Sequence, residues 1–295
     1  MVWALVADTN RWDRASGLTP EAVARQVDDI HELTDRPFGL NQLLFLVDEA
    51  RFAAMLDARP SVMSFAWPWP EQDLAAYFGR SHDAGALVMH MVSDVPGAEQ
   101  AARAGADMIV AQGNEGGGHV GMMGTLPLVA MVARAVAPVP VLAAGGVADG
   151  RGLAAALALG AEGVLLGTRF LATPEAPLHP AYKEAVVRSD GHDTIATDIP
   201  DVANGQVWPG AYFRVARNRF VERWIGREQE LRKRRAEVAA GLQAARAAGD
   251  VEEATIALGQ TAGLIDAVEP AGDLVRRIST EAESIIRERL PALLG

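Results

Sequence analysis

The sequence contains no cysteine. This absence excludes disulfide bonds, thiolate nucleophiles, iron–sulfur clusters and zinc sites with thiolate ligands. The chemistry of the protein must therefore come from a bound cofactor or from side chains that carry oxygen or nitrogen. Because nothing in the chain calls for an oxidising compartment, we expect a cytoplasmic protein.

Positive charge is also scarce, with 27 Lys and Arg residues against 38 Asp and Glu residues and a formal net charge of −11. Nucleic acids and anionic membranes are polyanionic, so we expect neither as a partner. No apolar run reaches the roughly 20 residues that span a bilayer. The start of the chain, "MVWALVADTN", has neither a basic region nor a cleavage-like site, so we expect no targeting segment.

What the sequence does contain is a repeated alternation of short apolar runs and Ala-rich helical patterns. One helical segment, "TPEAVARQVDDIHELT", opens with a Thr cap and a Pro at the first helical position. This alternation predicts a parallel sheet covered by helices, either a (β/α)8 barrel or an open doubly wound sheet. The predicted strands are the seven runs Val2–Ala7, Phe38–Phe45, Ser61–Trp67, Ala86–Val92, Asp107–Gln112, Pro140–Gly145 and Gly163–Gly167.

Two glycine-bearing loops favour the barrel. "AAGGVADG" (Ala143–Gly150) follows one predicted strand and opens a helix, and "LLGTRF" (Leu165–Phe170) follows the next strand. Glycines at strand ends let backbone N–H groups approach an anion, and barrel enzymes commonly bind phosphate after strands seven and eight. Here the loops follow the sixth and seventh runs. We therefore expect a TIM (β/α)8-type barrel whose first N-terminal strand is absent from this sequence or replaced.

The sequence pattern changes after about Thr173. A stretch rich in turn residues is followed by residues 211–249, which predict a long amphipathic helix. We expect the charge cluster "RKRR" (Arg232–Arg235) to be a solvated helix face. The expected domains are a barrel (1–172), a mainly helical cap or substrate subdomain (173–265) and a closing helix of the barrel (266–295). The apolar stripe of the long helix is Phe220, Trp224, Leu231, Val238 and Leu242.

Three motifs together carry a resemblance to a known family. They are "AQGNEGGGHVG" (residues 111–121), "VPVLAAGGVADGRGLAAALALGAEGVLLGTRFLATPEA" and "GQTAGLI". In this order and spacing the chain, from about Val2 to Ile286, resembles the nitronate monooxygenase (2-nitropropane dioxygenase-like) family of FMN-binding barrels. A sibling branch, the FMN-dependent enoyl-ACP reductases, has a similar Gly-Gly-His loop and similar phosphate loops.

The resemblance implies a set of site residues. It makes His119 the catalytic base, although the family usually has Ala where this chain has Gly116. The family's first strand and its Pro-Met loop have no counterpart in the sequence. The implied contacts of the FMN ring are Asn41, Gln112, Gly117 and Gly118. The implied contacts of the FMN phosphate are Gly145, Gly146, Leu165, Leu166, Gly167 and Thr168.

The chemistry of His119 is consistent with this resemblance. An imidazole with a pKa near 6.5 can take a proton from the carbon next to a nitro group, or orient a nitronate, at neutral pH. The family implies that the nitronate then gives an electron to the flavin and that O2 completes the oxidative cleavage to a carbonyl compound and nitrite. The expected partners are a small nitronate or nitroalkane and O2.

Other polar and aromatic residues have structural interpretations beside functional ones. We expect Glu115 to brace the glycine loop and Asp149 to cap a helix. His90 and Met91 either line the flavin or pack the barrel mouth, and the segment Trp67–Trp69 either walls the substrate or packs. The resemblance also brings Gln260 to the mouth of the site. The remaining histidines lack metal-ligand spacing, and we expect no metal site; they are His31, His82, His179 and His192.

Three functional hypotheses stay open at this point. The first is a flavin-dependent nitronate monooxygenase. The second is a flavin reductase that uses NAD(P)H on an enoyl thioester or a quinone. The third is a barrel that has lost FMN and activity together with its first strand.

Overall fold

The computed structural model describes residues 5–6 and 19–293, which form two compact units. Unit 1 contains the described residues up to Val92, together with Pro96–Val110 and Val136–Pro140. Unit 2 contains Ser93–Val95, Ala111–Ala135 and the chain from Val141 onward. Strand β5 (Met108–Gln112) runs from unit 1 into unit 2.

Unit 1 is built on a parallel sheet with the strand order β1-β2-β3-β4-β5. Strand β3 is buried at every position, as expected of a central strand in a helix-covered parallel sheet. The elements that precede β5 are β1 (Leu5–Val6), α1 (Pro20–Leu33), β2 (Gly39–Leu43), the 3-10 helix η1 (Leu44–Leu46), α2 (Glu49–Asp57), β3 (Val62–Ala66), α3 (Leu74–Asp83), β4 (Leu87–Val92) and α4 (Val95–Arg103).

Side-chain caps fix where several helices begin. Thr19 accepts a hydrogen bond from the backbone N–H of Ala22 and is followed by Pro20, as predicted. Asp73 caps α3 through the backbone N–H groups of Ala75 and Ala76. Each such cap contributes about 1 kcal/mol because it satisfies a backbone donor at the helix end.

An aromatic cluster fills the core of unit 1. The ring of Phe65 lies 5.9 Å from that of Phe52 and 5.5 Å from that of Phe78, and Phe78 in turn lies 5.5 Å from the imidazole of His90. His90 is 2% exposed, and its Nδ1 has no hydrogen-bond partner among the described residues. Burial lowers the pKa of His90 to about 4. This environment favours the packing interpretation of His90.

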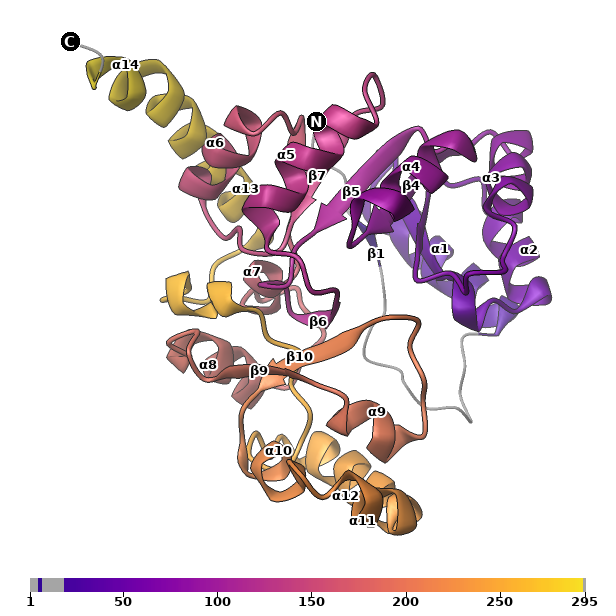
Figure 1. Cartoon of the computed structure of the whole chain (residues 1–295), viewed down its shortest axis with the longest axis vertical. Helices are drawn as coiled ribbons and strands as arrows, with labels where there is room; N and C mark the ends of the chain where they lie inside the picture. The colour runs from indigo at the N-terminus through magenta and orange to yellow at the C-terminus, as the bar shows by residue number, and fades with distance from the viewer. Residues whose placement is uncertain (1–4, 7–18, 294–295) are drawn as a thin grey trace. The chain divides into compact units, whose positions relative to one another are not determined.

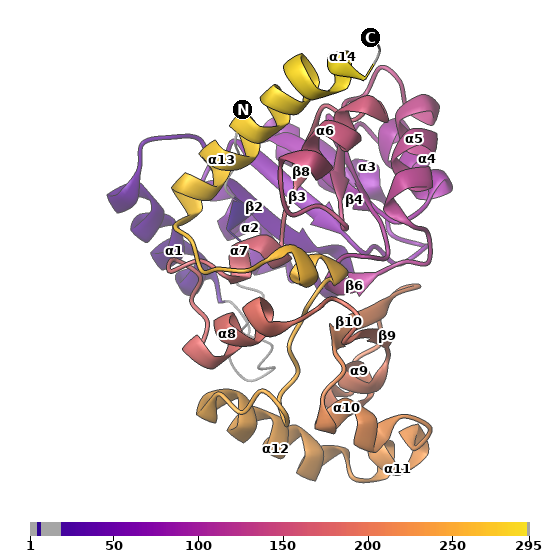
Figure 2. The ribbon, with the colours of Figure 1, turned by 90° about the vertical axis from the view of Figure 1, so that its left-hand side faces the viewer.

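Unit 2 continues the strand–helix alternation. The end of β5 is followed in the parallel sheet by β7 (Val141–Ala144) and β8 (Gly163–Leu165). The helices of this part are α5 (Thr125–Ala135), α6 (Gly150–Ala158) and α7 (Thr168–Leu171). The segment predicted to close the barrel contains α13 (Ala271–Ser284), which lies along α6 (Figure 2). It continues through the π-helix η3 (Ile285–Arg289) into α14 (Leu290–Ala292).

The strand prediction is confirmed in the part of the chain that the structure describes. Each of the seven predicted runs contains one parallel strand, although only Leu5–Val6 of the first run lies within the described residues. The predicted cap at Asp149 is confirmed, since its carboxylate accepts from the backbone N–H of Gly152. None of the described helices is long and apolar enough to cross a bilayer. The domain division at residues 172 and 265 stays a prediction.

The prediction of one long helix over residues 211–249 is wrong. This segment forms strand β10 (Tyr212–Ala216) and three helices, α10 (Arg219–Trp224), α11 (Glu228–Lys233) and α12 (Arg235–Ala248). Asn218 caps α10, and Gly226, with φ of +75°, follows the end of that helix. The apolar stripe is nevertheless buried in one cluster, since Phe220, Trp224, Leu231 and Leu242 meet there and Val238 packs against them. Arg232–Arg235 are exposed, as predicted.

A second sheet, which the sequence did not predict, lies in unit 2. Its strands are antiparallel in the order β6-β10-β9 (Figure 1). Strand β6 (Gly118–Val120) belongs to the glycine-rich loop, and β9 (Thr194–Thr197) belongs to the stretch predicted as turns. The same stretch also contains α8 (Pro180–Arg188) and α9 (Ile199–Asn204), and the 3-10 helix η2 (Gln260–Leu264) follows later in the chain.

The contact between α6 and α13 leads to a stability prediction. A Cβ atom on Gly150 would lie 2.5 Å from the backbone N of Ala282 and 2.6 Å from Cβ of Glu281. We therefore expect Gly150→Ala to lower the free energy of unfolding by about 1 to 3 kcal/mol, measured by urea denaturation. Gly241→Ala in α12 is the matched control, because its Cβ would meet nothing within 4 Å. Equal stability of the two variants would contradict the close packing.

The buried His90 predicts a pH dependence of stability. Its pKa is about 4 in the folded chain and near 6.5 when unfolded, so the unfolded state binds the proton first as the pH falls. The contribution of the neutral, buried His90 side chain to the free energy of unfolding is fully present above pH 6.5 and is lost as the pH falls from 6.5 to 4. We expect His90→Met to remove about 2 to 3 kcal/mol of the stability loss between pH 7 and pH 4.5. In urea denaturation the exposed His192→Gln should leave the loss unchanged, and an unchanged loss in His90→Met would contradict this assignment.

Candidate active site

His119 occupies the middle of β6, at the end of the glycine-rich loop. The pairing of β6 with β10 places Phe213 directly opposite His119. Gly118 has φ of +81°, a conformation that favours glycine. A Cβ on Gly117 would lie 2.6 Å from the backbone N of Gly259, so the loop and the chain before η2 approach each other too closely for a side chain there. The glycines thus let the loop enter β6 in close contact with its neighbour.

The imidazole of His119 is held on its edge and on both faces. Its Nε2 lies 3.0 and 3.1 Å from the two carboxylate oxygens of Asp201 in α9. The Trp208 ring stacks on it with centroids 3.3 Å apart, and the Phe213 ring does so at 4.2 Å. Two rings stacked this closely cannot share one face, so they cover opposite faces. His119 is 7% exposed and Asp201 is 6% exposed.

Two opposing effects set the protonation of His119. Burial lowers the pKa of the imidazole because it penalises the charged ring, whereas the hydrogen bond and the negative charge of Asp201 raise it. Burial is the larger effect, and the pKa of His119 lies below its usual value. The ring is therefore neutral at pH 7, the form in which a histidine can accept a proton.

Glu115 and Arg214 brace the glycine loop. The Glu115 carboxylate accepts from the backbone N–H of Thr125 at 2.9 Å and lies 2.8 Å from the Thr125 hydroxyl, at the start of α5. This confirms the predicted brace. Arg214, which is 8% exposed, donates from Nε to the carbonyl of Asn114 at 2.7 Å. Both contacts hold the loop from outside the His119 pocket.

Gln112, at the end of β5, carries an unsatisfied group. Its Oε1 is buried and has no hydrogen-bond partner among the described residues. Such an atom costs about 1 to 3 kcal/mol unless a ligand or water supplies a donor. A flavin ring carries an N–H donor, so the side chain of Gln112 suits the contact that the family resemblance implies for it.

The two loops of the expected phosphate site begin side by side. Ala144 at the end of β7 pairs with Leu165 at the end of β8, so the loops that start at Gly145 and Leu166 follow adjacent strand ends. Among the described residues, no group accepts from the backbone N–H of Gly146 or Gly167. Gly145 and Gly146 both have positive φ, 81° and 73°. These loops have backbone donors available for an anion.

The N-terminus of α6, which the loop Ala143–Gly150 opens, has two carboxylates bound to its backbone N–H groups. The Glu281 carboxylate from α13 accepts from the backbone N–H of Gly150 at 2.9 Å, and Asp149 caps the next turn. Two carboxylates therefore already occupy the helix end and would repel a phosphate. The Thr168 hydroxyl is also engaged, since it accepts from the backbone N–H of Gly259 at 3.1 Å.

Several other residues named from the sequence lie elsewhere. Asn41 belongs to β2 of unit 1, opposite Ser64, and its flavin contact stays a prediction. Trp69 packs edge-on against Phe45 at 6.1 Å, and Trp67 has an unusual φ of +54°; the substrate-wall hypothesis for this segment also stays a prediction. The backbone N–H of Gln260 donates to the carbonyl of Glu115, which brings η2 next to the glycine loop.

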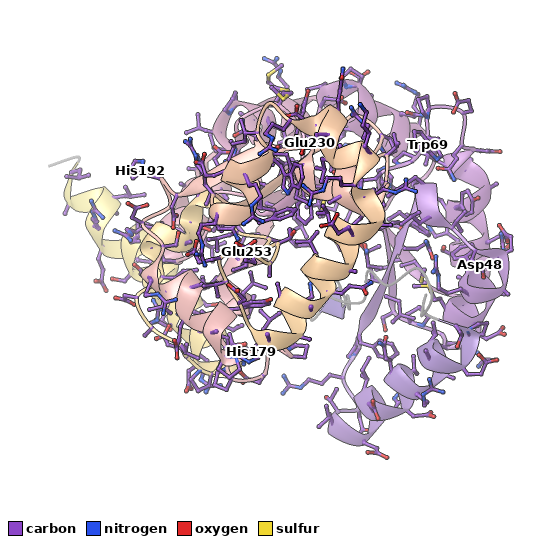
Figure 3. All side chains as sticks on the ribbon, turned by 90° about the horizontal axis from the view of Figure 1, so that it is seen from below. Asp48, Trp69, His179, His192, Glu230 and Glu253 are labelled. Carbon is purple, nitrogen blue, oxygen red and sulfur yellow. The ribbon has the colours of Figure 1, made fainter. Side chains whose placement is uncertain are left out.

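The remaining histidines have local contacts. His31 meets Phe38 edge-on, and His82 lies 2.8 Å from Asp107. His179 caps α8 and lies beside the C-terminal end of α12, while His192 is exposed (Figure 3). Across residues 19–293 the structure contains no group of three or more His, Asp or Glu side chains that could hold a metal ion.

Sequence analysis missed three residues that build the pocket of His119. Asp201, Trp208 and Phe213 all come from the segment between α8 and α10, which was predicted as turns and long helix. Asp201 lies 82 residues from His119 in the sequence. No local pattern links residues at that separation. The only available signal was the apolar alternation of "YFRVA", which is typical of a strand.

Comparisons with known proteins show which proteins the chain resembles in sequence and in fold. A curated relative from Neurospora crassa, a nitronate monooxygenase, is 37% identical over 221 residues, which cover 70% of this chain and 57% of the relative. The (3aS,4S,5R,7aS)-5-hydroxy-7a-methyl-1-oxo-octahydro-1H-indene-4-carboxyl-CoA dehydrogenase of Mycobacterium tuberculosis is 38% identical over 209 residues, 70% of this chain and 56% of that protein. The chain thus spans about half the length of the curated relatives it matches.

Among solved structures, FabK from Thermotoga maritima matches with a TM-score of 0.82 and 34% identity, covering 94% of this chain and 86% of that one. The fold is therefore that of the TIM-barrel enzymes related to FabK, and the predicted fold class is confirmed. The model of the family described as nitronate monooxygenase matches residues 46–281. With the His119 loop and both glycine loops inside that range, the chain belongs to the nitronate monooxygenase family.

Proposed function

We propose that the protein is an FMN-dependent nitronate monooxygenase, which oxidises nitronates or nitroalkanes with O2 to carbonyl compounds and nitrite. The observation that carries the proposal is the buried, neutral His119 at the end of the glycine-rich loop, in a chain of this family. The cytoplasm remains the proposed compartment, because the chain has no cysteine.

The residues present are suited to hold FMN. The unsatisfied Oε1 of Gln112 would accept from the flavin ring, beside Gly117 and Gly118. The backbone N–H groups of Gly146 and Gly167, which have no acceptor among the described residues, would bind the phosphate, with Gly145, Leu165, Leu166 and Thr168 shaping the two loops. Asn41 is the proposed contact from β2. Bound FMN would supply the electron acceptor of the reaction and the site of its encounter with O2.

His119 would act as the base that accepts the proton of the substrate. The neutral imidazole takes a proton from the carbon next to the nitro group, and the electron pair of the broken C–H bond spreads onto the nitro oxygens. Because Trp208 and Phe213 cover both faces of the ring, the substrate can meet His119 only at its edge. The same two rings keep water from the imidazole and so protect the neutral base.

A second candidate function is supported by the relatives themselves. One relative of 38% identity is a carboxyl-CoA dehydrogenase, and the FabK structure covers nearly the whole chain. A flavin enzyme of this kind would take electrons from NAD(P)H or pass them between NAD(P)H and a thioester or quinone. Several relatives named nitronate monooxygenase, at 37 to 40% identity, favour the first proposal.

The proposal predicts the effect of losing the base. We expect His119→Ala to lower the rate of O2 uptake with a nitroalkane by roughly 10² to 10⁴ while FMN stays bound, because a positioned base contributes that much. The rate is measured with an oxygen electrode, and bound FMN by its visible absorbance. His192→Ala, at an exposed position, is the matched control and should keep the rate. A His119→Ala variant as fast as the control would refute the assigned role.

A further inference from the structure

The carboxylate of Asp201 has a single hydrogen-bond partner among the described residues, the Nε2 of His119. Asp201 lies in the first turn of α9 and is 6% exposed, and α9 is packed by Ile199 and Val202 into the apolar cluster around Trp224. Burying a carboxylate is costly unless a donor compensates it. Burying the Asp201 carboxylate beside the imidazole therefore lowers the stability of unit 2. Packing alone does not explain why a charged side chain stands at this position.

We infer that Asp201 is a positioning residue that fixes the tautomer of His119, so that Nδ1 is the atom that takes the substrate proton. This inference rests on the proposed function. An ionised carboxylate only accepts hydrogen bonds, so Nε2 of the neutral ring carries the hydrogen and Nδ1 carries the lone pair. When the substrate C–H bond breaks, its proton goes to Nδ1 and the electron pair stays on the substrate.

The resulting imidazolium is stabilised by the same carboxylate. After proton transfer the ring is positive, and the negative charge of Asp201 lies 3.0 Å from its Nε2. Asp201 thereby offsets part of the penalty that burial places on the charged ring. Trp208 and Phe213 complete the arrangement, since rings stacked on both faces prevent the imidazole from flipping and exchanging its two nitrogens.

Two other charged side chains near His119, those of Arg214 and Glu115, are directed to other partners. Arg214 lies next to Phe213 on β10, but its guanidinium donates to the Asn114 carbonyl and the Thr194 hydroxyl. Glu115, on the loop before β6, directs its carboxylate to Thr125. Asp201 is the one charge with a resolved effect on the pKa of His119 among these neighbours.

The substitution Asp201→Asn separates positioning from packing. An Asn side chain has nearly the same shape, and its carbonyl oxygen can still accept from Nε2, so a purely structural contact would survive. Only the charge is lost. Asp198→Asn is the matched control, because Asp198 lies three residues away at the start of α9, its side chain makes no cap hydrogen bond, and it is not among the groups that shift the pKa of His119.

The first measurement uses NMR of the purified protein with ¹⁵N-labelled histidine. The His119 signals are assigned from their absence in His119→Ala. We expect the wild-type ring in its Nε2–H tautomer, and we expect Asp201→Asn to lower the pKa of His119 by about one unit or more, whereas Asp198→Asn leaves it unchanged. A wild-type Nδ1–H tautomer, or a pKa unmoved in Asp201→Asn, would overturn the inference. The wild-type tautomer decides the question even if the variant fails to fold.

The second measurement is the pH profile of kcat/KM with a nitroalkane. We expect the acidic limb to move to lower pH in Asp201→Asn and kcat/KM at its plateau to fall by at least 10-fold, with KM less affected than kcat. Asp198→Asn should keep the wild-type profile. If the protein turns over no nitro compound while the NMR results hold, the proposed function fails and the positioning role stands. If turnover occurs with an unshifted profile, the positioning role fails.

Discussion

The antiparallel pairing of β6 with β10 is the interaction on which the site depends. Three residues of the glycine-rich loop become a strand only because β10 offers them hydrogen-bonding partners. That pairing places Phe213 against His119 and, through the neighbouring strand β9, brings α9 and its Asp201 to the imidazole edge. Without it, His119 would be one polar residue in an open loop. The elements β9, α9 and β10, which follow α7, therefore position the side chains around His119, which lies earlier in the sequence.

Glycine is used here for close approach as much as for flexibility. The backbone at Gly117 nearly touches that at Gly259, which ties the chain before η2 to the loop of His119, and Glu115 and Thr168 add hydrogen bonds to the same segment. At the start of α6, the missing side chain of Gly150 lets α13 pack closely against the helix. The Glu281 carboxylate of α13 accepts a hydrogen bond from the backbone N–H of Gly150. The N–H groups that remain for an anion are then those of the loops after β7 and β8, and no longer those of the helix.

Local patterns in the sequence were enough to predict the strands of the parallel sheet, the caps at Thr19 and Asp149 and the Glu115 brace. Each depends on residues close together in the chain. The partners of His119 could not be predicted, because a pair 82 residues apart is set by sheet pairing. The long helix was mispredicted because an apolar stripe at helical spacing is compatible with three short helices that bury the same residues in one cluster.

The central claim is that this pocket serves a flavin that accepts electrons from a nitronate. The most direct measurement is anaerobic mixing of the FMN-loaded protein with propionate 3-nitronate, and separately with NADH or NADPH, while the visible absorbance of the flavin is followed. The account predicts rapid bleaching by the nitronate, little by either nicotinamide, and nitrite formation once O2 is admitted. Rapid bleaching by NADH or NADPH, with none by the nitronate, would contradict it and identify a reductase.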